Sequence, residues 1–189
     1  HLAGRWDDPF RFERIAARLE AGRHDVTDFR ALQLDRRSGL AHALLPAMLT
    51  ARPLDARSRD WLERLAAWDR HAAAERPEPL VFAAWYHALA EHLYADELGE
   101  LFPVYRGQRA AFVHAALTRR QAWCDDVVTA SREDCAEVLG AALASALARL
   151  DAALGPPGPA WRWGRQHPAE FVNDTYAELG VFGRLAHAR

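Results

Sequence analysis

The chain has 189 residues, of which 50% are apolar and 26% charged, so it is long enough to bury a core and too apolar to be disordered throughout. Its formal net charge of −2 supplies no basic field for nucleic acid or anionic lipid, and we expect neither partner. No run approaches the roughly 18 uninterrupted apolar residues that a membrane-spanning helix needs, so we expect no membrane span. Every Lys or Arg position is arginine and alanine is abundant, which is typical of a GC-rich bacterial genome.

Apolar residues at helical spacing dominate the first part of the chain. Pro9 stands near the start of the first predicted helix. The apolar stripe of that helix consists of Phe12, Ile15, Ala16 and Leu19. A second, longer helix is predicted over residues 27–49 with Thr27 as its N-cap, and Gly39 and Pro46 inside it predict a kink or a break.

The same periodicity continues to about residue 154. Helices are predicted over residues 57–68, after Pro77 and Pro79, and over residues 108–117. The clearest pattern covers residues 131–154, where Ser131 followed by Asp134 resembles a capping box.

Glycine and proline at 155–159 end the last long helix, and residues 160–189 are predicted to be a mostly irregular tail with short helices. Because no alternating strand pattern occurs, we predict an all-α, irregular multi-helix segment. We expect residues 1–189 to form a single helical unit.

Two cysteines, Cys124 and Cys135, lie eleven residues apart. They are too few for a disulfide scaffold, and no Cys-x-x-Cys or paired Cys/His spacing suggests zinc. A single bridge formed in an oxidising compartment and two buried thiols both remain open.

No constellation for catalysis by this chain alone is visible. None of the serines lies in a Gly-x-Ser-x-Gly elbow, and Ser131 is better explained as a cap. Ser38 and His42 are four residues apart, but no third group is specified to orient them. A self-sufficient hydrolase based on Ser38 or Cys124 is therefore disfavoured.

Metal sites are also disfavoured. In His87, Glu91 and His92 the second histidine stands at i+5, whereas the zincin helix needs it at i+4, so we expect a solvated polar face. The acidic pairs at 7–8 and 125–126 match no EF-hand loop, and we expect caps or turns there.

Five short segments, in chain order, carry a resemblance to a known family. The segments cover residues 6–15, 26–38, 65–69, 123–135 and 161–167. In that order, the first segment is similar to a tryptophan followed by an arginine that opens a helix, and the second to Leu-Gln-x-Asp-x-x-Ser. The third is similar to Leu-x-x-Trp-Asp and the fourth to a Trp-Cys-Asp-Asp stretch before a long helix. The fifth is similar to Trp-x-Trp-Gly-x-x-His. Together they resemble the middle and late part of the large subunit of the penicillin acylase family of N-terminal-nucleophile hydrolases.

The resemblance implies an enzyme made as one exported precursor and cut into a small and a large subunit. It implies hydrolysis of side-chain amides of small molecules, such as β-lactams or acyl-homoserine lactones, by an N-terminal serine whose α-amino group is the base. The implied core is an αββα sandwich with helical decorations, and the implied location is the periplasm or outside the bacterial cell. The remainder of the large subunit and the small subunit would be the partners of this segment.

Compared with that scheme, the chain lacks most of the chemistry. It does not begin with serine, contains no Ser-Asn-x-Trp, and its one asparagine, Asn173, is not in a segment that resembles the family's oxyanion segment. We therefore expect the segment to be inactive alone. The resemblance also implies that the family's calcium site lies outside it, so we expect no cofactor or metal here.

One site residue is carried over from the family. By its spacing from Trp6 and the following Arg14-Ile15 pair, Arg11 occupies the position of an arginine that helps to hold the oxyanion asparagine. A planar, always-charged guanidinium suits that supporting role. The alternative is an arginine at a helix start that makes a surface salt bridge.

The other signature residues are predicted to be structural, through capping, hydrogen bonds between helices and aromatic packing. They are Gln33, Asp35, Trp68, Asp69, Trp163 and His167.

A stand-alone helical scaffold or interaction module without activity is the alternative function. An acylase fragment predicts an exposed apolar patch where the sandwich docks, whereas a scaffold predicts that the apolar stripes are buried internally.

Overall fold

The computed structural model describes residues 8–20, 22–104 and 109–168. Its α helices are α1 (Phe10–Leu19), α2 (Val26–Gln33), α3 (Gly39–Met48), α4 (Ala56–Ala66), α5 (Glu78–Leu98), α6 (Ala110–Thr118), α7 (Cys135–Leu154) and α8 (Trp163–Gln166). Three short 3₁₀ helices, η1 (Gly99–Leu101), η2 (Gln121–Cys124) and η3 (Pro159–Trp161), lie between them. No strand occurs in this part of the chain, which confirms the all-α prediction.

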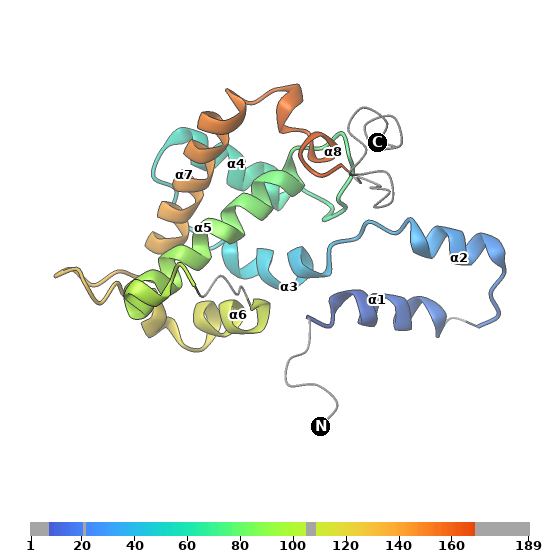
Figure 1. Cartoon of the computed structure of the whole chain (residues 1–189), viewed down its shortest axis with the longest axis horizontal. Coiled ribbons are helices and arrows are strands. Elements are labelled where there is room, and N and C mark those ends of the chain that lie inside the picture. The colour runs from blue at the N-terminus through green and yellow to red at the C-terminus, as the bar shows by residue number, and fades with distance from the viewer. Residues whose placement is uncertain (1–7, 21, 105–108, 169–189) are drawn as a thin grey trace, which may run out of the picture.

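Helices α5 and α7 form the centre of the fold, and the other helices except α1 and α2 surround them (Figure 1). One hydrophobic core joins α3 to α7 and includes Trp85, Leu139 and Trp161, each 0% exposed. The buried Trp85 indole donates to the Leu139 carbonyl oxygen at 3.0 Å, so its polar N–H is satisfied inside the core. Among the described residues no helix is both long enough and apolar enough to cross a membrane.

The helix predicted over residues 27–49 is two helices. Thr27 is not its N-cap, because the Asp25 side chain accepts the N–H groups of Thr27 and Asp28 and forms a capping box with Asp28. The break predicted from Gly39 lies at residues 34–38, and Ser38 caps the new helix through the Ala41 N–H at 3.1 Å. Pro46 lies inside α3, two residues before its end, and does not break it.

The start of α7 also differs from the prediction. Its N-cap is Asp134, paired in a capping box with Glu137, so Ser131 is not the cap. The Ser131 hydroxyl instead donates to Glu133 at 2.8 Å. The predicted Ser-x-x-Asp box lies three residues upstream of a real Asp-x-x-Glu box, which has the usual glutamate at its third helical position.

The predicted tail begins with η3 and α8, two short helices, and its remainder after residue 168 lies outside the described residues. The Trp161 ring stacks on Trp61 of α4 with centroids 5.6 Å apart, and its indole donates to the Gly155 carbonyl oxygen at 2.9 Å. These contacts attach the segment after α7 to the core.

Candidate functional site

Arg11 lies in the first turn of α1 and reaches the end of α2. Its guanidinium donates to the carbonyl oxygens of Leu32 at 3.1 Å and Asp35 at 3.4 Å. Carbonyls at a helix C-terminus lack intrahelical donors and carry partial negative charge, so a guanidinium is a favourable partner. The side chain is therefore held in place, although the residue is exposed.

Arg14 and Asp35 form an ion pair between α1 and the segment after α2. The Asp35 carboxylate accepts from Arg14 Nε at 2.8 Å and Nη2 at 2.6 Å, and its side chain is only 7% exposed. Burial alone raises the pKa of this carboxyl, but the Arg37 N–H and the Arg14 guanidinium outweigh it and hold the pKa below its usual value. Arg11 and Arg14 thus fasten the two helices at one end.

Ser38 and His42 do not form a catalytic dyad. The Ser38 hydroxyl accepts the Ala41 N–H as a helix cap, and His42 Nε2 accepts from Arg37 Nε at 2.8 Å. Burial and the charges of Arg37 and Arg70 lower the pKa of His42. Its ring is occupied by an arginine and is not directed to a nucleophile, in agreement with the sequence prediction.

Cys124 and Cys135 form a disulfide, which decides between the two alternatives that the sequence left open. The bridge joins η2 to the first residue of α7. Because a disulfide sulfur is no thiolate nucleophile, Cys124 offers no nucleophile for a self-sufficient hydrolase while the bridge is intact.

Of the polar residues 87, 91 and 92 on α5, Glu91 forms an ion pair. Glu91 accepts from Arg149 of α7 at 2.8 Å, and this hydrogen bond is the main reason that its pKa is lowered. Among the described residues, no three His, Cys, Asp or Glu side chains are arranged to hold a metal ion.

An open groove of about 660 Å³ lies between α5 and α7. Its carboxylates come from Glu91, Asp96, Asp126, Glu133 and Glu137, but each accepts hydrogen bonds within the fold. Next to Asp96 in the chain, burial and the Asp96 side chain raise the pKa of Glu97 to about 7. The sequence pattern did not reveal this groove, because its two walls are far apart in the chain: Glu91 and Arg149 are separated by 58 residues.

The acidic pair at 125–126 has the turn role expected of it. Asp125 accepts the Glu133 N–H at 3.1 Å, and Asp126 accepts the Val128 N–H at 2.9 Å. These bonds shape the loop before α7. Of the other acidic pair, residue 7 lies outside the described residues.

Comparisons with known proteins place the chain in a family. The penicillin amidase family model matches residues 1–186. The chain is 31% identical to the acyl-homoserine lactone acylase QuiP of Pseudomonas aeruginosa over 203 residues, which cover 92% of this chain and 23% of that protein. The chain belongs to the penicillin amidase family.

Similar relatives occur in other pseudomonads. The acyl-homoserine lactone acylase QuiP of Pseudomonas syringae pv. tomato is 28% identical, with 99% of this chain and 26% of that protein covered. The protein of the same name from Pseudomonas putida is 29% identical, with 95% and 25% covered. The chain thus spans 23% to 26% of the length of these acylases.

Five of the six residues that resemble the penicillin amidase signature make hydrogen bonds, an ion pair or a ring contact within the fold. The Trp68 indole donates to the His71 carbonyl oxygen at 3.0 Å, and Asp69 accepts the His71 N–H at 3.0 Å. Trp163 stacks on His167 with ring centroids 4.5 Å apart. Asp35 binds Arg14, as described above, and Gln33 is the last residue of α2.

Proposed function

We propose that this chain is the helical segment of the large subunit of a penicillin-acylase-like amidohydrolase, whose nucleophile lies in another part of the polypeptide. The match of the family model to residues 1–186 carries the proposal. The chain covers 23% of the acylase from Pseudomonas aeruginosa, which supports a larger protein around this segment. The reaction is hydrolysis of a side-chain amide of a small molecule. The names of the similar relatives favour an acyl-homoserine lactone over a β-lactam as substrate.

The hydrogen bonds of Arg11 favour an auxiliary role for this residue in that enzyme. Two carbonyl oxygens at the end of α2 fix the guanidinium, so the side chain is preorganised before any partner arrives. We propose that it positions the asparagine that holds the oxyanion, with the remainder of the large subunit and the small subunit as its partners. This segment is inactive alone under the proposal and holds no cofactor of its own.

The disulfide supports a location outside the cytoplasm. Disulfides persist in the periplasm and outside the cell, whereas cytoplasmic thiols are kept reduced. A periplasmic or secreted acylase meets this condition.

The alternative, a stand-alone scaffold, receives less support. A stand-alone scaffold is expected to bury its apolar stripes internally. However, α1 has no buried residue, and Phe12 is 74% exposed. Exposed apolar side chains at one place are instead expected of a segment that packs on more protein.

The test uses the natural gene product that contains these residues and measures kcat/KM on an acyl-homoserine lactone. Arg11→Ala should lower kcat/KM about 100-fold, the usual effect of weakening an oxyanion contact. Arg11→Lys should recover only part of the loss, because lysine lacks the planar fork. Arg59→Ala, which removes an exposed arginine of α4, is the control and should leave the rate unchanged. A wild-type protein without amidase activity would contradict the proposed function. An Arg11→Ala variant with the kcat/KM of the wild type would contradict the role of Arg11.

A further inference from the structure

Two short segments, one after α2 and one after α4, lie side by side and bring basic side chains together. Arg37 and His71 form an antiparallel bridge pair between the segments, and the Ser38 N–H donates to the Arg70 carbonyl oxygen at 2.9 Å. The backbone hydrogen bonds therefore give the region a fixed shape. We call Arg37, His42, Arg70 and His71 the arginine cluster.

His42 of α3 lies among the basic groups of this cluster. Its Nε2 accepts from Arg37 Nε at 2.8 Å. Burial is the largest cause that lowers the pKa of His42, and the neighbouring basic groups lower it further. These groups are Arg37, Arg70, His71 and Arg14. Basic groups from three parts of the chain and from α1 thus surround a single imidazole.

The nearby carboxylates do not neutralise the cluster. Asp35 is paired with Arg14, and the Asp69 side chain accepts a backbone N–H at 3.0 Å. Neither Arg37 nor Arg70 takes part in an ion pair with another described residue. Like charges held together without acidic partners repel one another, so this region favours the binding of an anion.

Arg70 is the member of the cluster with the most unusual environment. Among the described residues it is the one non-glycine residue with a positive φ, at 62°. Its Nε is buried and has no hydrogen-bond acceptor, although the residue as a whole is only half-buried. A buried donor without an acceptor is costly. An oxyanion bound side-on to a guanidinium accepts from Nε and one Nη together, which would supply the missing acceptor.

We propose that the arginine cluster binds a small oxyanion, a phosphate or a carboxylate group, through the guanidinium groups of Arg37 and Arg70. The planar guanidinium matches the paired oxygens of both groups, whereas a chloride ion has no such pair. Binding at this cluster is separate from the amidase reaction and is measured without turnover. A protein that binds the oxyanion but lacks amidase activity would contradict the proposed function and leave the oxyanion site standing.

Calorimetric titration of inorganic phosphate into the natural gene product, at low ionic strength, tests the proposal. Arg70→Gly and, separately, Arg37→Gln should each weaken phosphate binding by about tenfold or more, because each removes a charge-assisted contact. Arg59→Gln, which removes an exposed arginine of α4, is the matched control and should bind as the wild type does.

Three results of this titration would overturn the proposal. The first is a wild type that binds neither phosphate nor acetate. The second is an equal loss of binding in Arg59→Gln, because the attraction would then be diffuse. The third is binding by the 189-residue chain but not by the natural gene product, because a side chain of the larger protein would then occupy the cluster.

Acetate distinguishes the two kinds of oxyanion. Displacement of phosphate by acetate would identify a site for carboxylates, whereas phosphate binding that acetate does not disturb would identify a site for phosphate groups. Either result supports an oxyanion site.

Thermal unfolding separates ligand binding from a structural role of Arg70. Glycine adopts a φ of 62° without strain, so Arg70→Gly should melt no lower than the wild type in the absence of phosphate. Phosphate should raise the melting temperature of the wild type, because it binds the folded state, and should leave that of the variant unchanged. A rise of equal size in both proteins would overturn the proposal.

The His42 ring reports where the anion binds. A negative charge beside it should raise the pKa of His42 towards its usual value, because it offsets the charges of Arg37 and Arg70. An NMR titration of the His42 ring with and without phosphate measures this change. A His42 pKa that phosphate does not move would place the anion elsewhere and contradict the proposed site.

Discussion

At the scale of single residues, the clearest feature is a buried carboxylate at the start of α5. Glu78 is 5% exposed and accepts from Arg76 Nε at 2.9 Å and Arg64 Nη2 at 3.1 Å. Burial alone raises the pKa of this carboxyl, but the hydrogen bonds from the two arginines outweigh it and hold the pKa below its usual value. Its place in the first turn of a helix also favours a negative charge.

Glu78→Gln should lower the free energy of unfolding by about 1–3 kcal/mol at neutral pH, because two charge-assisted hydrogen bonds are weakened. The folded pKa is lowered, so the unfolded chain binds the proton more tightly. The contribution is therefore complete above the ordinary pKa of 4.5 and is lost as the pH falls through the folded value. Urea unfolding measured across this acid range should show that the difference in free energy of unfolding between wild type and variant falls towards zero.

The control for this prediction is Glu63→Gln on α4, which removes an exposed carboxylate without an ion pair among the described residues. Its effect should stay within about 0.5 kcal/mol. A Glu78→Gln difference that does not change with pH would show that the carboxylate charge is not the cause.

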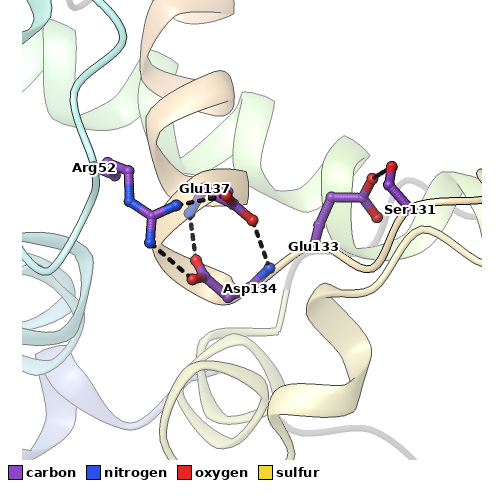
Figure 2. A network of polar contacts seen from close by, with 5 residues as sticks. All are labelled: Arg52, Ser131, Glu133, Asp134 and Glu137. Carbon is purple, nitrogen blue, oxygen red and sulfur yellow. Dashed lines mark hydrogen bonds and ion pairs between the residues drawn. The ribbon is translucent and has the colours of Figure 1, made fainter.

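At the scale of elements, a close crossing between the segment after α3 and the first turns of α7 organises the packing. The Arg52 N–H donates to the Ala136 carbonyl oxygen at 2.8 Å, and the Arg52 guanidinium binds Asp134 and Glu137 (Figure 2). These ion pairs are about half exposed, so we expect them to contribute little by themselves. The close approach depends on the absence of a side chain at Gly140, one turn further along α7.

Gly140→Ala should destabilise the protein by about 3 kcal/mol, because an added Cβ would lie 1.9 Å from the Arg52 carbonyl oxygen. Helix propensity has the opposite sign and favours alanine by about 1 kcal/mol. Ala148→Gly, at an exposed position of the same helix, calibrates that propensity and should cost about 1 kcal/mol. A Gly140→Ala protein more stable than wild type in thermal unfolding would refute the close crossing.

At the scale of the whole molecule, the described residues combine a core around α5 and α7 with two helices, α1 and α2, that extend away from it (Figure 1). The Cys124–Cys135 bridge lies on the core side and fastens η2 to α7. The core gives the segment its own stability, whereas α1 and α2 leave apolar side chains such as Phe12 and Val26 exposed.

Replacing both bridged cysteines, as Cys124→Ala with Cys135→Ala, should lower the free energy of unfolding by about 3 kcal/mol, the value expected for a loop of this length. A reductant should lower the urea midpoint of the wild type by a similar amount. The same reductant should leave the double variant unchanged, which controls for other effects of the reagent. A wild type insensitive to reductant would contradict a stabilising bridge.

Much of the helical layout was predictable because helix periodicity and capping are local. The stripe of residues 131–154 and the break around Gly39 appear in the structure, although Asp25 and Asp134 replace the predicted caps. Those caps were misassigned because several Asp, Ser and Thr residues near each helix start are equally good candidates by type. Which of them caps the helix depends on where the backbone turns, and that is decided by packing.

The sequence by itself determined the helical class and the family, since apolar spacing and short motifs are properties of the linear chain. Only the tertiary structure decided that Cys124 and Cys135 are bridged, that Arg11 binds the end of α2, and that no residue of the α1 stripe is buried. A stripe has the same pattern whether it faces a core or solvent. Its burial depends on what lies opposite it in space, and no local pattern contains that information.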